Sequence, residues 1–182
     1  MTTPAAEELE RIDLILQSSD GPQYEFVGGE LRERNVSTDS SEVALFIAAM
    51  LMNHIRPARL AKLFDSELGI RIFRDPMETR RASVSFVSAG RAPEHDTGFL
   101  RVAPDLVVEV VSPGDKASEL RAKVTEWLAN GVRLVWVAYP HEREIHVFRA
   151  GGESSIYRAD QEISGEDVIP GFASKTRELF PS

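Results

Sequence analysis

The stretch Ala103-Pro104-Asp105-Leu106-Val107-Val108-Glu109-Val110-Val111-Ser112-Pro113 contains the most apolar strand candidate of the chain. From Leu106 to Val111, every side chain except that of Glu109 is aliphatic. A strand that is apolar on both faces is typical of the centre of a sheet that is covered on both sides. We therefore expect this strand to be central in an α/β domain, with helices flanking the sheet.

Glu109 is the exception in this strand and the first candidate for a functional residue. An ionised carboxylate among aliphatic neighbours costs several kcal/mol unless it is paired, hydrogen-bonded or bound to a metal. Two interpretations stay open. Glu109 serves a site, or it is a structural carboxylate that pairs with an arginine or accepts a hydrogen bond from a backbone amide.

The segment after the strand predicts a helix. Ser112-Pro113-Gly114-Asp115 ends the strand, and Gly131 supplies the C-terminal stop of the helix. Between them, apolar residues recur at the spacing of a helix that packs on a sheet. These residues are Leu120, Val124, Trp127 and Leu128.

Turn residues and periodicity place the other elements. Gly28-Gly29 predicts a hairpin beginning at Tyr24, and Ser40 or Ser41 caps a helix that runs to His54 and is largely buried. The other expected elements are a hairpin of residues 69–73 with 81–87, a buried strand at 133–138, a more exposed partner at 144–149 and a helical turn at 174–180. In the strand 81–87, alternation places Ser83 on a polar face.

Composition fits one globular domain. The chain has 182 residues, of which 42% are hydrophobic and 27% charged, and it has no cysteine, which excludes disulfides, thiolate nucleophiles and cysteine zinc sites. The N-terminal residues are acidic, and no apolar run approaches the ~20 residues that cross a bilayer. We expect a single domain over residues 1–182, with its core at 40–150, in the cytoplasm.

The net charge of -8 argues against a general basic surface for nucleic acid. Residues 71–101 are different, because they hold six arginines and four acids, a local charge of +2. This distribution allows a basic strip, for which Arg74, Arg80 and Arg81 are the candidate nucleic-acid contacts, although a solvated face explains it as well.

Several familiar catalytic motifs are missing. The chain has no glycine-rich phosphate loop, no Gly-x-Ser-x-Gly elbow and no His-Glu-x-x-His pair. Their absence disfavours P-loop nucleotide hydrolysis, α/β-hydrolase chemistry and zinc proteolysis. The histidines are scattered, and His141 and His146 are expected on either side of a turn in an edge hairpin.

The chain resembles the Uma-type putative restriction endonuclease family, a branch of the PD-(D/E)xK nuclease superfamily. The resemblance runs nearly end to end, and the 103–113 block is its most specific part. The other matching blocks are Tyr24-Glu25-Phe26 through Gly29-Glu30-Leu31, Val84-Ser85-Phe86-Val87, Lys123, Gly131-Val132-Arg133-Leu134-Val135-Trp136-Val137 and residues 165–172. The resemblance implies a restriction-endonuclease-like αβββαβ core with a mixed central sheet, an N-terminal hairpin and a C-terminal extension.

The resemblance also implies a phosphodiesterase site with Mg²⁺ or Mn²⁺, which takes oxygen ligands, and a lysine near the reacting water. Glu109 matches the central acid of the family. The superfamily lysine is expected two residues later, where this chain has Val111, and Lys123 on the following helix matches the position that takes its role. A surface pair of Lys123 with Glu119 is the structural alternative. Where the family has a metal-binding aspartate, this chain has Ser83, a neutral and weakened metal position.

Two further acids are candidates for this site. Asp105 shares a strand face with Glu109 but starts about 13 Å from it at ~3.3 Å per residue, so one ion reaches both only across a bend. Its alternative is a residue at the start of the strand, bonded to a loop. Glu30 matches an acid of the family motif, and its alternative is an exposed hairpin carboxylate.

Three functions remain open. The first is a divalent-metal-dependent nuclease using Glu109, Lys123 and either Asp105 or Glu30, acting on nucleic acid and above all DNA. The second is a pseudo-nuclease that binds nucleic acid or a protein in the same cleft without cutting. The third is a scaffold that self-associates, for example as a homodimer, through its edge strands and C-terminal segment.

Overall fold

The computed structural model describes residues 6–73, 77–94 and 98–181. Two short sheets flank a central six-stranded sheet, whose strand order is β3-β4-β5-β6-β7-β8. The helices are α1 (Ala6–Leu16), α2 (Thr38–Ala58) and α3 (Ala117–Ala129), with 3-10 turns η1 (Gly21–Gln23) and η2 (Thr176–Leu179). The strands are β1 (Tyr24–Val27), β2 (Glu30–Glu33), β3 (Ala61–Asp65), β4 (Val84–Ser88), β5 (Leu106–Val110), β6 (Leu134–Tyr139), β7 (Glu144–Arg149), β8 (Ser154–Tyr157), β9 (Glu162–Ser164) and β10 (Ala173–Lys175).

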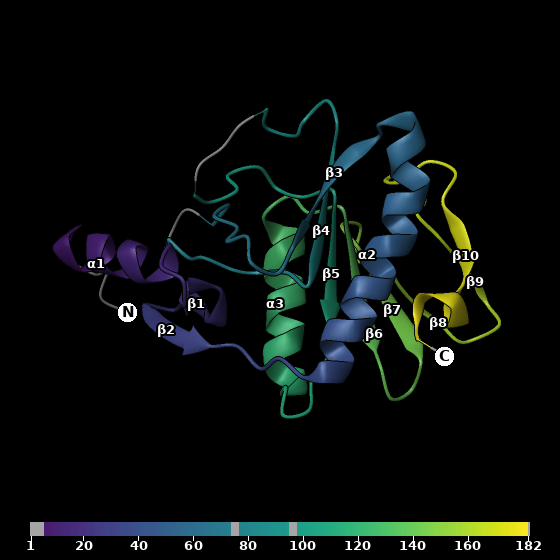
Figure 1. The fold of residues 1–182 in the computed structure, drawn as a ribbon. Coiled ribbons are helices and arrows are strands. Elements are labelled where there is room, and N and C mark those ends of the chain that lie inside the picture. Colours follow the sequence, from purple (N-terminus) through teal and green to yellow (C-terminus); the bar gives the residue numbers. More distant parts are fainter. Residues whose placement is uncertain (1–5, 74–76, 95–97, 182) are drawn as a thin grey trace.

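The strand that holds Glu109 lies in the interior of the sheet, as its sequence predicts. β5 pairs antiparallel with β4 and parallel with β6, and all five of its residues are buried. The order α2, β3, β4, β5, α3, β6 is the expected αβββαβ core with a mixed sheet. Figure 1 shows the N-terminal α1 and the β1–β2 hairpin on one side of this core and the C-terminal strands on the other.

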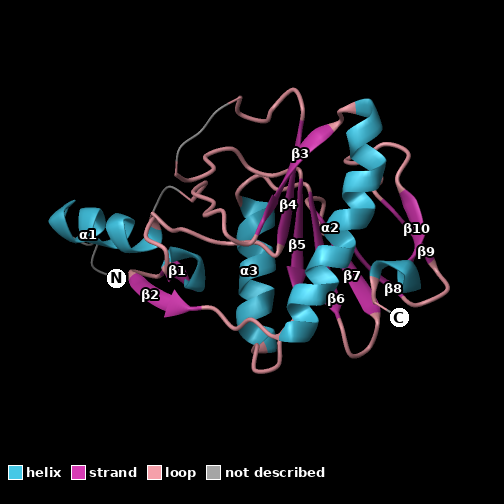
Figure 2. Cartoon of the chain, in the orientation of Figure 1, coloured by secondary structure: helices cyan, strands magenta, loops and turns pink. Residues whose placement is uncertain are grey.

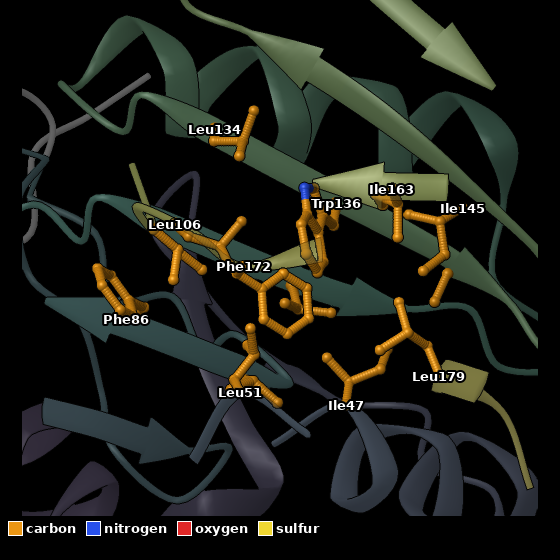
Figure 3. Packing of buried hydrophobic residues seen from close by; sticks show 14 of the residues in the cluster. Ile47, Leu51, Phe86, Leu106, Leu134, Trp136, Ile145, Ile163, Phe172 and Leu179 are labelled. Atoms are coloured by element: carbon orange, nitrogen blue, oxygen red, sulfur yellow. The ribbon is translucent and has the colours of Figure 1, made fainter. Parts of the chain in front are cut away.

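The two faces of the sheet are covered by different helices. Val108 of β5 packs in one core cluster with Ile47 and Leu51 of α2, whereas Val107 packs in a second cluster with Val124 and Trp127 of α3. Alternation along β5 therefore turns Glu109 toward α3. The C-terminal segment closes the α2 side, where Figure 3 shows Phe172 near Trp136, with ring centroids 6.0 Å apart.

The helix after the N-terminal hairpin departs from its sequence prediction. Its N-cap is Ser37, whose side chain accepts from Ser40 N, so α2 begins three residues before Ser41. The prediction that this helix is largely buried is wrong, because Leu45 is 70% exposed and Phe46 is 39% exposed. Only one stripe of α2 packs on the sheet, and within the described residues the opposite face of the helix is exposed. The buried residues of that stripe are Ser40, Val43, Ile47, Leu51 and Ile55.

The predicted hairpin of residues 69–73 with 81–87 is also wrong. β4 pairs instead with β3, which follows α2 directly, and segment 69–73 makes only isolated bridges from Ile70 to Arg80 and Leu100. Figure 2 shows that long loops lie between β3 and β4 and between β4 and β5. The Ser83 side of β4 is not a solvent face, because Ser85 and Val87 are buried beneath the α3 side of the sheet.

The remaining differences concern the two ends of the described chain. α1 was not expected from the sequence, and its Ile12 and Leu16 pack with Phe26 and Phe99 in a small separate cluster. β7 pairs with β6 as predicted, but β8 pairs with its other side, so β7 is not an edge strand. The final 3-10 turn, η2, lies where a helical turn was expected.

The single buried stripe of α2 gives the first prediction. Ile47→Ala should lower the free energy of unfolding by about 2 to 5 kcal/mol, because it leaves a cavity between α2 and the sheet. Leu45→Ala, two residues away on the exposed face, should change it by about 0.5 kcal/mol or less. Urea denaturation measures both. Similar losses for the two variants would mean that α2 buries both faces in solution.

Candidate active site

Glu109 is held by two side chains of α3. Trp127 Nε1 donates to Glu109 Oε1 at 2.7 Å, and Lys123 Nζ donates to Oε2 at 3.1 Å. Lys123 and Trp127 are four residues apart and therefore lie on the same face of the helix. The helical periodicity of α3 thus brings both donors to one carboxylate, that of a residue that is 6% exposed as a whole.

A second carboxylate, that of Glu25 on β1, reaches the same lysine. Its Oε1 atom lies 3.0 Å from Lys123 Nζ and accepts from Arg81 N at 2.7 Å. The β1–β2 hairpin is held in this place by two backbone hydrogen bonds between Phe26 and Thr79, of 3.0 and 2.9 Å. Sequence reasoning missed Glu25, although it stands within the quoted Tyr24-Glu25-Phe26 motif. The available signal was a carboxylate between two aromatic residues of a short strand.

The ammonium of Lys123 therefore lies among three oxygen atoms. Besides the two carboxylates, it donates to the backbone carbonyl of Arg81 at 2.8 Å. An ammonium has three N–H groups, so every donor has an acceptor. We call this arrangement of Glu25, Glu109, Lys123 and the Arg81 carbonyl the lysine cage. The surface pair of Lys123 with Glu119 is not formed, since Glu119 pairs with Lys116 at 3.0 Å.

Arg80 extends the charged group on the Glu25 side. Its Nη1 atom lies 3.3 Å from Glu25 Oε2, and its Nη2 atom forms an ion pair with Glu126 of α3. The side chain of Arg80 is 10% exposed, so its charge acts inside the protein. If all groups are ionised, three carboxylates face the two cations Arg80 and Lys123, which leaves a net charge of -1.

Arg81 has a structural environment. It is 1% exposed, and its guanidinium donates to three backbone carbonyls, those of Leu16, Tyr24 and Glu67. Arg80 and Arg81 therefore do not form the surface strip that the sequence allowed, because both point into the protein. Arg74 lies outside the described residues.

Ser83 lies between the cage and the central strand. Its hydroxyl oxygen accepts from Val110 N at 3.0 Å, and the Arg81 carbonyl of the cage is two residues before it. The structure thus brings position 83 next to the strand of Glu109. A cavity of about 460 Å³ adjoins this point, and Ser83, Val110, Arg34, Asp65 and Glu67 are among its lining residues.

Asp105 and Glu30 lie elsewhere. Asp105 accepts from Ser88 N at 2.8 Å and forms an ion pair with Arg91, an arrangement that anchors the loop after β4 to the start of β5. The side chain of Glu30 is 76% exposed, and its nearest cation is Arg32 at 4.0 Å. Neither carboxylate takes part in the contacts of the lysine cage.

The oxygen atoms of the cage suit a divalent cation in their chemistry. Mg²⁺ and Mn²⁺ prefer carboxylate and carbonyl ligands, and Glu25, Glu109 and the Arg81 carbonyl converge on one point. Within the described ranges, no three histidine, cysteine, aspartate or glutamate side chains gather into a metal site. These oxygen atoms therefore suit the cation, but only two of them come from carboxylates. The ammonium of Lys123 lies at the point on which they converge.

The two carboxylates differ in their ionisation. Burial raises the pKa of Glu109 above its ordinary value of 4.5, the Lys123 charge opposes this, and the Glu25 charge adds to it. Burial also acts to raise the pKa of Glu25, but Lys123, Arg80 and the Arg81 amide together hold it below 4.5. Burial opposes the charge of Lys123, whereas Glu109 and Glu25 raise its pKa, so the lysine stays cationic. On acidification Glu109 is protonated first.

These pKa shifts predict opposite slopes of stability with pH. The folded pKa of Glu109 lies above the unfolded value, so stability should fall as pH rises from about 4.5 to that folded pKa. The lowered pKa of Glu25 makes stability fall as pH drops below 4.5.

Glu109→Gln should remove the first slope, and Glu153→Gln, at an exposed position, should keep it. Urea denaturation across pH measures the slopes, and NMR of labelled glutamate side chains measures the pKa of Glu109 directly. An ordinary pKa for Glu109 would contradict its burial.

Asp105 gives a separate prediction. Asp105→Ala leaves Ser88 N–H without its acceptor and removes the ion pair with Arg91, so the free energy of unfolding should fall by about 1 to 3 kcal/mol. The affinity for Mn²⁺, measured by calorimetry, should not change. A folded variant that has lost Mn²⁺ binding would instead make Asp105 a ligand.

Comparisons with known proteins agree with this architecture. Curated proteins give no match to the chain. A solved structure, "Crystal structure of a putative nuclease belonging to DUF820 from Anabaena variabilis ATCC 29413", has a TM-score of 0.77 at 20% identity and covers 87% of this chain and 90% of its own. No helix of the described residues is long and apolar enough to cross a membrane. The family model Uma2, described as "Putative restriction endonuclease", matches residues 6–177, and the chain belongs to this family.

Proposed function

We propose that the protein hydrolyses phosphodiester bonds of nucleic acid with a divalent cation, Mg²⁺ or Mn²⁺, held by Glu109 and Glu25. The observation that carries this proposal is the convergence of these two carboxylates, from β5 and β1, on Lys123. Carboxylates can hold the ion that assists phosphodiester hydrolysis, and a neighbouring lysine can stabilise the negative charge that develops. The family to which the chain belongs supports nucleic acid as the substrate, and its description favours DNA.

The residues of the site would divide the work as follows. Glu109 and Glu25 supply negative oxygens for the cation, which when bound polarises the phosphate and activates water. Lys123 donates hydrogen bonds to phosphate oxygens and steadies the charge that develops on them. Trp127 fixes the orientation of Glu109 through its 2.7 Å hydrogen bond. The cavity beside Ser83, with Arg34 in its lining, would hold the substrate strand next to position 83.

A pseudo-nuclease is the second candidate, and two observations favour it. Position 83 has a serine, and the ammonium of Lys123 already holds the point where the two carboxylates converge. In this function the same cleft binds nucleic acid without cutting it. Retention of an oligonucleotide that weakens with salt, together with no cleavage by the parent at any Mn²⁺ concentration, would select this candidate. A homodimer is compatible with both functions, and the oligomeric state is measured by sedimentation.

Position 83 provides the test of the nuclease. Ser83→Asp keeps an oxygen acceptor for Val110 N–H and adds a carboxylate beside the cage, so it should strengthen Mn²⁺ binding and raise cleavage from a weak or absent level. Its melting temperature should depend more on Mn²⁺ than that of the parent, because an ion that binds only the folded state stabilises it.

Two controls accompany this variant. Ser118→Asp adds the same charge at an exposed position of α3 and should change neither property. Ser83→Asp combined with Glu109→Ala should not cleave. Strong metal-dependent cleavage by the parent that depends on Glu109 and is not improved by Ser83→Asp would show that the chain has rebuilt its site around another ligand.

A further inference from the structure

The ammonium of Lys123 occupies the position in the lysine cage that a divalent cation would take. The three acceptors, Glu25 Oε1, Glu109 Oε2 and the Arg81 carbonyl, lie 3.0, 3.1 and 2.8 Å from Lys123 Nζ. A divalent ion bound to both carboxylates would lie within a few ångströms of the ammonium. Like charges at such a distance in a buried site repel strongly. The ammonium and the ion therefore cannot share these oxygens.

The side chain of Lys123 is the most exposed of the three charged side chains of the cage. It is 17% exposed, more than those of Glu109 and Glu25, at 8% and 10%. Lysine has a flexible stem that can move its charge toward water while the stem stays packed. The two carboxylates are fixed more firmly, because Trp127 holds Glu109 and the amide of Arg81 holds Glu25. Displacing the ammonium would thus leave the carboxylate oxygens in place.

We propose that Lys123 is the resident cation of this site and that a divalent ion binds Glu25 and Glu109 only by displacing it. This inference rests on the proposed function in taking a divalent ion as the competitor. In this inference the lysine competes with the metal ion for the carboxylates and does not bind it. The lysine stabilises the metal-free protein by pairing with the two carboxylates, and by the same contacts it weakens the metal site.

Lys123→Met tests the competition, because methionine keeps an unbranched side chain and removes the charge. The variant should bind Mn²⁺ about tenfold more tightly or better, since the ion no longer has to replace an ammonium. Without Mn²⁺ it should melt at a lower temperature than the parent, and saturating Mn²⁺ should recover most of the loss. Calorimetry and thermal unfolding without nucleic acid measure both effects. Lys116→Met, at the N-cap of the same helix, where the lysine is exposed and pairs with Glu119, should change neither.

A measurement on the parent does not depend on the folding of any variant. The ammonium of Lys123, with three acceptors in a buried site, should give a slowly exchanging signal in proton–nitrogen NMR of lysine side chains. Titration with Mg²⁺ should remove this signal with the midpoint that calorimetry gives for Mg²⁺. A Lys123 signal that persists when Mg²⁺ is fully bound would overturn the displacement.

The outcomes separate this inference from the proposed function. Tighter Mn²⁺ binding by Lys123→Met together with lost cleavage supports both, because the lysine is also needed for catalysis. Equal Mn²⁺ affinities of parent and Lys123→Met overturn the competition and leave the nuclease intact. No Mn²⁺ binding by the parent, Lys123→Met or Ser83→Asp overturns both.

Discussion

The burial of the Glu109 carboxylate is the constraint on which the rest of the site depends. A charged group inside a sheet covered by two helices is tolerated only with a partner charge and hydrogen bonds to its oxygens. Lys123 and Trp127 supply these from α3, which fixes how that helix lies on β5. Glu25 then joins the same lysine from β1, so one ammonium connects three segments far apart in the chain. Removing Lys123 would leave the buried charge of Glu109 without its ion-pair partner, which typically costs about 3 to 5 kcal/mol.

The connection also explains why the N-terminal hairpin is part of the site rather than an appendage. β1 is not a strand of the central sheet. It is held by the Phe26–Thr79 backbone pair, by the Glu25–Arg81 amide bond and by the Arg81 guanidinium, which binds carbonyls of Leu16 and Tyr24. Buried hydrogen bonds of this kind favour one arrangement, because each broken bond exposes a polar group to an apolar environment. Glu25 is thereby positioned by tertiary contacts and not by sheet pairing.

The sequence revealed what depends on local pattern. The aliphatic run around Glu109 predicted an interior strand, and the spacing of Val124 and Trp127 predicted the helix that brings Lys123 to it. The sequence did not predict contacts between residues that are distant in the chain. Glu25 resembled an ordinary hairpin acid because nothing near it in the sequence shows that Lys123 will reach it. Strand β4 pairs with β3, whose residues 61–65 did not read as a strand in the sequence. Arg81 appeared to be a surface cation, since its carbonyl acceptors lie 14, 57 and 65 residues away.

The serine at position 83 and the lysine cage are consistent with each other in charge. In a site built for a divalent ion, two positive charges balance several carboxylates, and an aspartate at position 83 would add one more negative charge. Here a single ammonium faces Glu25 and Glu109, with Arg80 balancing the outer side. A third carboxylate without a metal would leave additional negative charge buried and would destabilise the fold. A neutral residue at position 83 therefore suits a protein whose site is occupied by its own lysine. Under the proposed competition, the nuclease and the pseudo-nuclease differ in whether a divalent ion can displace Lys123 from this one position.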